Sequence, residues 1–123
     1  VLATPNTDCV DFQIFGKHHW GEYHKPRHWY LFEKKSFDFL VERLDCNLIE
    51  FQVYILSSFW VISFHSLFKK FLGKNLASKI FPPVKIFNGG VYERCLLTFF
   101  AVLERFILAV TGRGNAMWIT LKR

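Results

Sequence analysis

Four histidines near the amino terminus are the residues whose type and spacing most suggest chemistry. His18, His19, His24 and His28 lie within eleven residues, and imidazole nitrogens bind zinc, copper, nickel and iron. Their spacing matches no standard zinc pattern, and no Cys-x-x-Cys pair accompanies them. Pro26 also interrupts the helix that would align His24 with His28. We therefore predict no metal site and expect these histidines to lie in an interfacial loop.

His65 is the only histidine inside a long uncharged segment, which covers residues 51–68. An ionisable side chain at membrane depth would suit a haem ligand or a proton carrier. Membrane haems mostly take two axial ligands, however, and no other histidine lies in an apolar segment. We predict no cofactor here and expect His65 to form a hydrogen bond with a neighbouring helix.

Neither the cysteines nor any short motif indicates catalysis. Cys9, Cys46 and Cys95 are odd in number and widely spaced, which argues against the disulfide framework of a small secreted protein. The sequence contains no nucleophile elbow, phosphate-binding loop, dinucleotide fingerprint or His-Glu-x-x-His motif. Glu42 and Asp45 fit the solvated face of a helix. We predict that the chain is not an enzyme and takes no small-molecule substrate.

The composition limits the classes of protein to which the chain can belong. Its 123 residues are 51% hydrophobic and 19% aromatic, with fifteen phenylalanines and a net charge of +6. These values exclude a disordered tail, and seven glycines and four prolines exclude a collagen-like chain. Two classes are left, a basic soluble domain and a small membrane protein with charged flanks.

The charge is distributed unevenly along the chain. Residues 1–50 contain six basic and eight acidic residues, residues 51–68 contain none, and residues 69–123 contain ten basic and two acidic residues. A basic flank after an uncharged segment is typical of the cytoplasmic, matrix or stromal end of a membrane span. We therefore expect Lys69, Lys70 and Lys74 to contact lipid headgroups.

The uncharged segment predicts a membrane span. As a helix it would extend for about 27 Å, close to the hydrocarbon thickness of a bilayer. Apolar neighbours widen the predicted transmembrane helix to residues 48–72. Its serines, Gln52 and His65 make insertion marginal, and the alternation of apolar and polar residues over 51–55 allows a buried strand instead.

A second hydrophobic helix is predicted over residues 92–111, closed by Gly112. Consecutive charges at Glu104 and Arg105 offset most of the free energy gained by inserting its apolar residues in a bilayer. Adjacent residues on a helix do not face each other, so these two charges cannot neutralise one another there. We expect this helix to be buried against other proteins, with both charges paired to partners.

Together these elements predict a mainly α-helical, membrane-associated protein with four segments. An extended arm, rich in aromatic residues and histidine, covers residues 1–35. Residues 36–72 form an amphipathic helix, with Ser36 as its N-cap, that leads into the transmembrane helix. A basic loop rich in proline and glycine covers residues 73–91, and residues 92–123 form the hydrophobic helix and a basic tail.

The predicted function is that of a non-catalytic accessory or structural subunit of a larger membrane protein complex. The basic, aromatic composition and the lack of a disulfide framework favour an energy-converting organelle membrane, such as the mitochondrial inner membrane. One alternative is a soluble, basic RNA-associated protein, such as a peripheral component of an organellar ribosome. Its basic stretches at residues 17–27 and 69–85 would contact phosphates, and the nearby aromatic residues would stack on bases: Trp20, Tyr23, Trp29, Tyr30 and Phe71. A second is a haem- or metal-binding membrane protein. The expected partners are other subunits and lipid headgroups, with nucleic acid less favoured.

Overall fold

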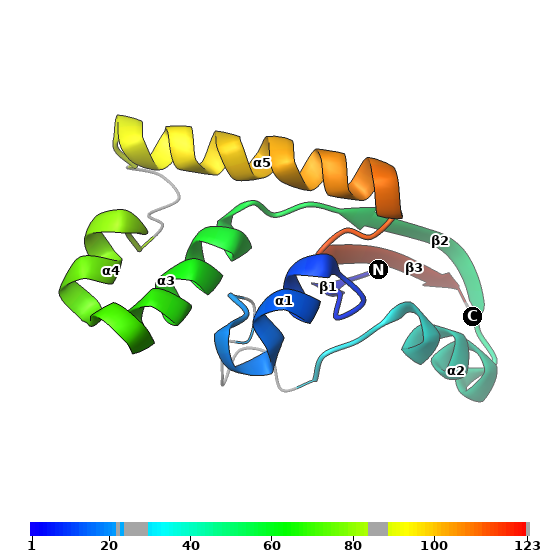
Figure 1. Cartoon of the computed structure of the whole chain (residues 1–123). Helices are drawn as coiled ribbons and strands as arrows, with labels where there is room; N and C mark the ends of the chain where they lie inside the picture. Colours follow the sequence, from blue (N-terminus) through cyan, green and yellow to red (C-terminus); the bar gives the residue numbers. More distant parts are fainter. Residues whose placement is uncertain (22, 24–29, 84–88, 123) are drawn as a thin grey trace.

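The computed structural model describes residues 1–21, 23, 30–83 and 89–122. In chain order the elements are β1 (Leu2–Pro5), α1 (Val10–His19), α2 (Lys34–Leu44), β2 (Asn47–Tyr54), α3 (Ser58–Leu72), α4 (Lys74–Ile80), α5 (Val91–Thr111) and β3 (Ala116–Lys122). The described part is thus a mixed structure of five helices and a three-stranded sheet, 58% helical. The mainly α-helical prediction was wrong in omitting the sheet, which lies at the opposite end of the molecule from α4 (Figure 1).

The three strands form one antiparallel sheet in the order β1-β3-β2, so the last strand of the chain lies in the middle. Met117 and Ile119 of β3 are fully buried, whereas Trp118 between them is 46% exposed. Alternate residues of a strand point to opposite faces. One face of β3 is therefore covered, and Phe37 of α2 packs against it in a small apolar core.

A second core joins α1, α3 and α5. Its buried members are aromatic or small apolar residues: Cys9, Phe15, Trp20, Trp60, Val61 and Phe100. The rings of Trp60 in α3 and Phe100 in α5 stack with centroids 5.8 Å apart and an interplanar angle of 13°. Phe15 of α1 meets Trp60 edge to face at 5.5 Å. The first contact holds α5 on α3, and the second holds α1 on α3. Figure 1 shows α5 lying above α3.

The predicted transmembrane helix at residues 48–72 is not formed. Asn47–Tyr54 is strand β2, and α3 has only 15 residues, which corresponds to about 22 Å. The alternating pattern and the β-branched residues favour a strand, and β3 provides its partner. Gly73, at φ +78°, then ends α3 in a conformation that suits glycine. Among the described helices, none combines the length and apolar character needed to cross a bilayer.

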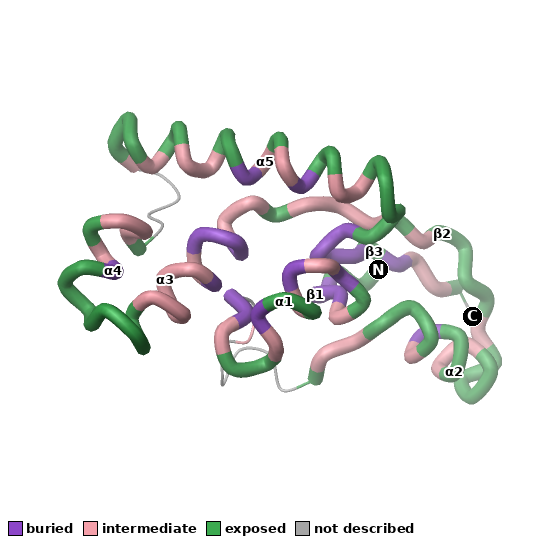
Figure 2. The backbone as a smooth tube through the Cα atoms, viewed as in Figure 1, coloured by how far each residue is buried: buried purple, intermediate pink, exposed green. Residues whose placement is uncertain are grey.

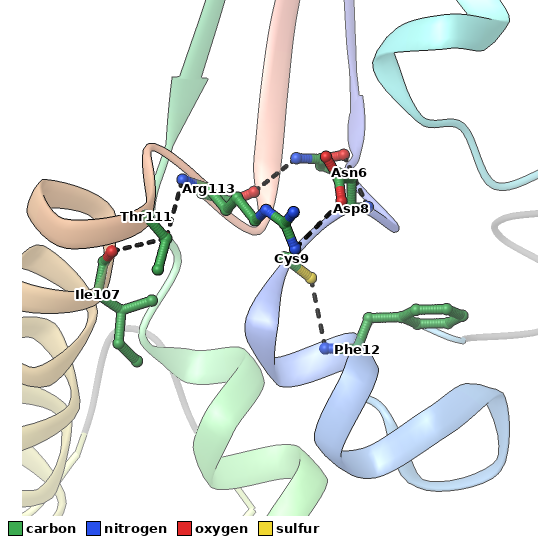
Figure 3. A network of polar contacts seen from close by, with 8 residues as sticks. Asn6, Asp8, Cys9, Phe12, Ile107, Thr111 and Arg113 are labelled. Carbon is green, nitrogen blue, oxygen red and sulfur yellow. Dashed lines mark hydrogen bonds and ion pairs between the residues drawn. The ribbon is translucent and has the colours of Figure 1, made fainter.

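The described part of residues 1–35 is not an extended arm, because it forms β1 and α1. Long-range contacts fix the segment that joins these two elements. Asn6 Nδ2 donates a hydrogen bond to the Gly114 carbonyl oxygen at 2.8 Å, and Arg113 forms an ion pair with Asp8 at 3.6 Å, as Figure 3 shows. Partners more than a hundred residues apart leave no local pattern in the sequence, which is why the prediction failed here.

Two helices lie close to their predicted positions. α5 ends at Thr111 before Gly112, which has φ +68° and closes the helix as predicted. α2 begins earlier than predicted, because its N-cap is Glu33. Ser36 instead lies in the first turn, where its Oγ accepts a hydrogen bond from the backbone N–H of Glu33 at 3.4 Å.

Candidate functional site

One side of α5 is apolar and is not covered by the described part of the chain. Phe99, Phe106 and Val110 have exposed fractions of 63%, 67% and 69%. The full set of exposed apolar residues on this side is Val91, Tyr92, Cys95, Phe99, Val102, Phe106, Ala109 and Val110. Their spacing of three or four residues places them on one face, here named the outer face of α5. In Figure 2 this is the exposed side of α5 that is turned away from α3.

The opposite side of α5 packs on the second core. Phe100 and Glu104 are buried there, each 4% exposed. Four partly buried aliphatic residues extend the packed side: Leu96, Leu97, Leu103 and Ile107. The inner side is therefore buried against the chain's own core, with Glu104 bonded to Asn115, whereas the sequence predicted burial against other proteins. A contiguous exposed apolar surface, such as the outer face, is typical of an interaction site.

Two arginines border the outer face along one edge. Arg94 and Arg105 are eleven residues apart, close to three helical turns, so they share this edge with Thr98 between them. Both are exposed, and neither forms an ion pair with a described residue. An apolar face with a cationic edge is typical of helices that lie in the plane of a membrane surface.

The three lysines predicted to contact lipid headgroups lie together where α3 meets α4. Lys69 and Lys70 are exposed at the end of α3, and Lys74 is exposed at the start of α4. The Nζ atom of Lys70 lies 5.7 Å from the centroid of the Phe71 ring. This turn lies at the end of the molecule away from the sheet (Figure 1).

Two of the four clustered histidines can be placed, and both lie in the last turn of α1 and not in the predicted loop. His18 is exposed at the end of α1, and His19 Nδ1 lies 3.2 Å from Ser66 Oγ of α3. His24 and His28 lie outside the described residues. Within the ranges that the structure describes, no three His, Cys, Asp or Glu side chains gather as a metal site would require.

His65 contacts the end of a neighbouring helix. Its Nδ1 lies 2.7 Å from the carbonyl oxygen of Phe81, the C-cap residue of α4. Because a carbonyl oxygen only accepts, His65 Nδ1 carries the proton and donates it to this hydrogen bond. The contact is of the kind predicted from the sequence, and it joins α3 to the end of α4.

Trp20, which base stacking on RNA would use, is not accessible. It is 3% exposed and packs edge to face on Phe12 with centroids 5.0 Å apart. A side chain enclosed in this way cannot present its ring to a base. Tyr30, by contrast, is 78% exposed.

Sequence reasoning missed a buried polar cluster where α1, α5 and the start of β3 meet. Asn115 Nδ2 donates a hydrogen bond to Glu104 Oε1 and another, at 3.4 Å, to Asp11 Oδ2. Trp20 Nε1 donates to the same Asp11 oxygen at 2.9 Å, and the backbone N–H of Leu56 donates to Asn115 Oδ1 at 2.8 Å. The cluster therefore joins four separate segments. Its one sequence signal was an acidic residue, Glu104, within an apolar helix.

The two carboxyl groups of this cluster share a site with little access to solvent. Asp11 is 2% exposed and Glu104 is 4% exposed. Burial, with a further contribution from the charge of Asp11, raises the pKa of Glu104 to about 7. The indole N–H of Trp60 lies near enough to Glu104 to oppose this rise in pKa, although Trp60 Nε1 and Glu104 Oε2 make no hydrogen bond of ordinary geometry with a described residue. The charge of Glu104 therefore opposes the packing of α5 on the core.

No family model, curated protein or solved structure matches this chain. The strongest candidates for a functional surface are the outer face of α5 and the turn that carries Lys69, Lys70 and Lys74. Covering exposed apolar side chains, such as those of the outer face, lowers the free energy.

The three cysteines are free and differ in accessibility. Cys9 is 1% exposed, and its Sγ accepts a hydrogen bond from the backbone N–H of Phe12 at 3.4 Å, as drawn in Figure 3. Burial raises the pKa of the Cys9 thiol far above its ordinary value. Cys95, by contrast, is exposed on the outer face of α5, so it provides a chemical probe of that surface.

Proposed function

We propose that this chain is a non-catalytic accessory subunit of a larger membrane protein complex and attaches through the outer face of α5. The observation that carries the proposal is the exposure of Phe99, Val102 and Phe106, at 63%, 60% and 67%. Covering one large apolar side chain contributes about 1.5–3 kcal/mol. Several such side chains on one helix therefore favour a partner that covers them together.

The partner that we propose is an apolar helical surface of membrane subunits. α5 has 21 residues, long enough to lay its whole apolar face in a groove between helices. Arg94 and Arg105 on its edge suit the anionic headgroups beside such a surface. The basic and aromatic composition of the chain favours an energy-converting organelle membrane, such as the mitochondrial inner membrane, as the location of the complex.

The test is co-purification of the tagged chain in mild detergent. Phe99→Ser combined with Phe106→Ser removes two large side chains from the outer face. On the inner side it removes only the edge-to-face contact of Phe99 with Phe100, whose centroids lie 5.3 Å apart. The matched control is Tyr30→Ser combined with Phe39→Ser, because these side chains are 78% and 57% exposed away from α5. We expect the wild type and the control to retain the same membrane subunits, and the α5 variant to recover about tenfold less of them or worse.

Two results would contradict the proposal. Equal recovery of the same subunits by all three proteins would mean that the outer face makes no functional contact. Sedimentation of the chain with large particles that ribonuclease abolishes would support the RNA-associated alternative instead.

A further inference from the structure

The turn between α3 and α4 combines cationic and apolar side chains on one exposed segment. The segment is named here the α3–α4 corner and consists of Lys69, Lys70, Phe71, Leu72, Gly73, Lys74, Asn75 and Leu76. Phe71, Leu72 and Leu76 are 72%, 48% and 44% exposed, and all three lysines are exposed. Water is a poor environment for such apolar groups, so the corner favours a surface that accepts both kinds of side chain.

Gly73 gives the corner its shape. Its backbone, at φ +78° and ψ 164°, both ends α3 and begins α4, so the chain changes direction within one residue. No heavy atom outside its chain neighbours lies within 4 Å of the position that a Cβ would take there. The corner therefore projects from the end of the molecule away from the sheet (Figure 1).

The positive charge of the corner has no local compensation. No acidic residue occurs in the sequence between Glu50 and Glu93. Lys69, Lys70 and Lys74 form no ion pair with a described residue. The corner thus presents three cations that are available to an anionic surface.

We propose that the α3–α4 corner inserts into the surface of a bilayer that contains anionic lipids. This inference rests on the membrane association proposed above and names the lipid that the chain contacts. The lysines bind headgroup phosphates, while Phe71 and Leu72 enter the boundary between headgroups and acyl chains. The aliphatic side chains favour a bilayer over RNA, because leucine gains nothing from stacking on bases.

The test is sedimentation of the full chain with vesicles of phosphatidylcholine, with and without phosphatidylglycerol. The lysine variant carries Lys69→Gln, Lys70→Gln and Lys74→Gln, and the apolar variant carries Phe71→Ser and Leu72→Ser. The matched control carries Gln in place of three exposed lysines elsewhere, Lys17, Lys35 and Lys122, and so has the same net charge as the lysine variant. A lysine at an anionic membrane surface is worth roughly a fivefold change in affinity.

We expect the wild type and the control to bind the anionic vesicles preferentially, with an affinity that falls as salt is added. The lysine variant should lose on the order of a hundredfold in affinity and most of the salt dependence. The apolar variant should bind more weakly and keep the salt dependence. Equal losses in the control and the lysine variant, or wild-type binding that ignores phosphatidylglycerol, would overturn the inference.

Two further measurements separate this inference from the proposed function. The lysine variant should still co-purify the subunits that the wild type retains, because its α5 is intact. The Phe99→Ser, Phe106→Ser variant should still bind anionic vesicles through the corner. Binding of single-stranded RNA that requires the corner lysines, together with no vesicle binding, would show that the corner takes nucleic acid and would also overturn the inference.

Discussion

Asn115 donates a hydrogen bond to Glu104, and through this contact the residue that precedes β3 holds the inner side of α5. Asn115 also exchanges hydrogen bonds with the backbone N–H and carbonyl oxygen of Leu56, at 2.8 Å and 3.3 Å. One amide side chain thus connects α5, β3 and the segment that joins β2 to α3. The position of α5, and therefore the direction in which its outer face points, depends on this connection.

Replacing Asn115 with Ala should destabilise the fold strongly. The substitution removes the donor to Glu104 and one of the two donors to Asp11, and it leaves the backbone N–H of Leu56 unpaired. We expect it to lower the free energy of unfolding by about 3 kcal/mol or more. Urea denaturation followed by circular dichroism measures the loss. Asn75→Ala, at an exposed position of α4, is the control and should change the stability little. A small loss for Asn115→Ala would mean that water satisfies the cluster.

Glu104 should make the fold less stable as the pH rises. The pKa of its carboxyl group rises from the ordinary value of 4.5 to about 7 in the folded state, so between these values the folded chain binds more protons than the unfolded chain. The free energy of unfolding therefore decreases with rising pH through this interval, by up to about 1.4 kcal/mol per pH unit, and this contribution is constant above the folded pKa. Protonated Glu104 is neutral, and this neutral form is the one that suits a buried site.

Glu104→Gln isolates this pH dependence, because glutamine keeps an acceptor for Asn115 and carries no charge. Urea unfolding from below pH 4.5 to above pH 7 should show a stability difference between wild type and variant that grows with pH. Glu42→Gln, at an exposed position of α2, should give a curve parallel to the wild type. Parallel curves for Glu104→Gln would show that Glu104 titrates normally in the fold.

The sequence predicted the elements that are marked by a regular spacing of apolar residues. The helix that ends before Gly112 follows from its apolar residues and from the glycine, and the alternation over 51–55 correctly allowed a strand. The mistaken choice of a span over that strand came from counting apolar residues, because a partly covered strand and a marginal membrane helix can have similar compositions. The pattern alone did not show that β3, more than sixty residues later, would supply that partner.

The candidate site was predicted only in part, for a similar reason. The lysines at 69, 70 and 74 were identified from charge alone, and the structure places them on one exposed turn. The polar cluster joins Asp11 to Asn115, 104 residues away in the sequence. The sequence shows that the charge of Glu104 is unfavourable in an apolar helix. It does not show that Asn115 and Asp11 lie beside Glu104, because the tertiary fold brings these residues together.

Gly114 should not tolerate a side chain. A Cβ at this position would lie 2.6 Å from the carbonyl oxygen of Tyr54 and 3.1 Å from the Tyr54 carbonyl carbon, so the backbones of β2 and the segment before β3 would have to separate. We expect Gly114→Ala to lower the free energy of unfolding by about 2 kcal/mol or more. Gly90→Ala, where nothing lies within 4 Å of the new Cβ, is the matched control. Equal melting temperatures for both variants would contradict the close approach.

The reactivity of the cysteines should show whether α1 packs as described and whether a partner covers the outer face of α5. In the native chain Cys95 should react rapidly with a maleimide, whereas Cys9 should react only after unfolding, because it is buried and its thiolate is strongly disfavoured. A Cys46→Ser background leaves one reactive and one protected thiol, which mass spectrometry distinguishes after native and denaturing labelling.

If the outer face of α5 is covered in the membrane complex, labelling of Cys95 should be at least about tenfold slower there than in the isolated chain. Unchanged labelling of Cys95 in the complex would show that α5 is not the attachment surface, whereas rapid native labelling of Cys9 would show that α1 does not pack as described.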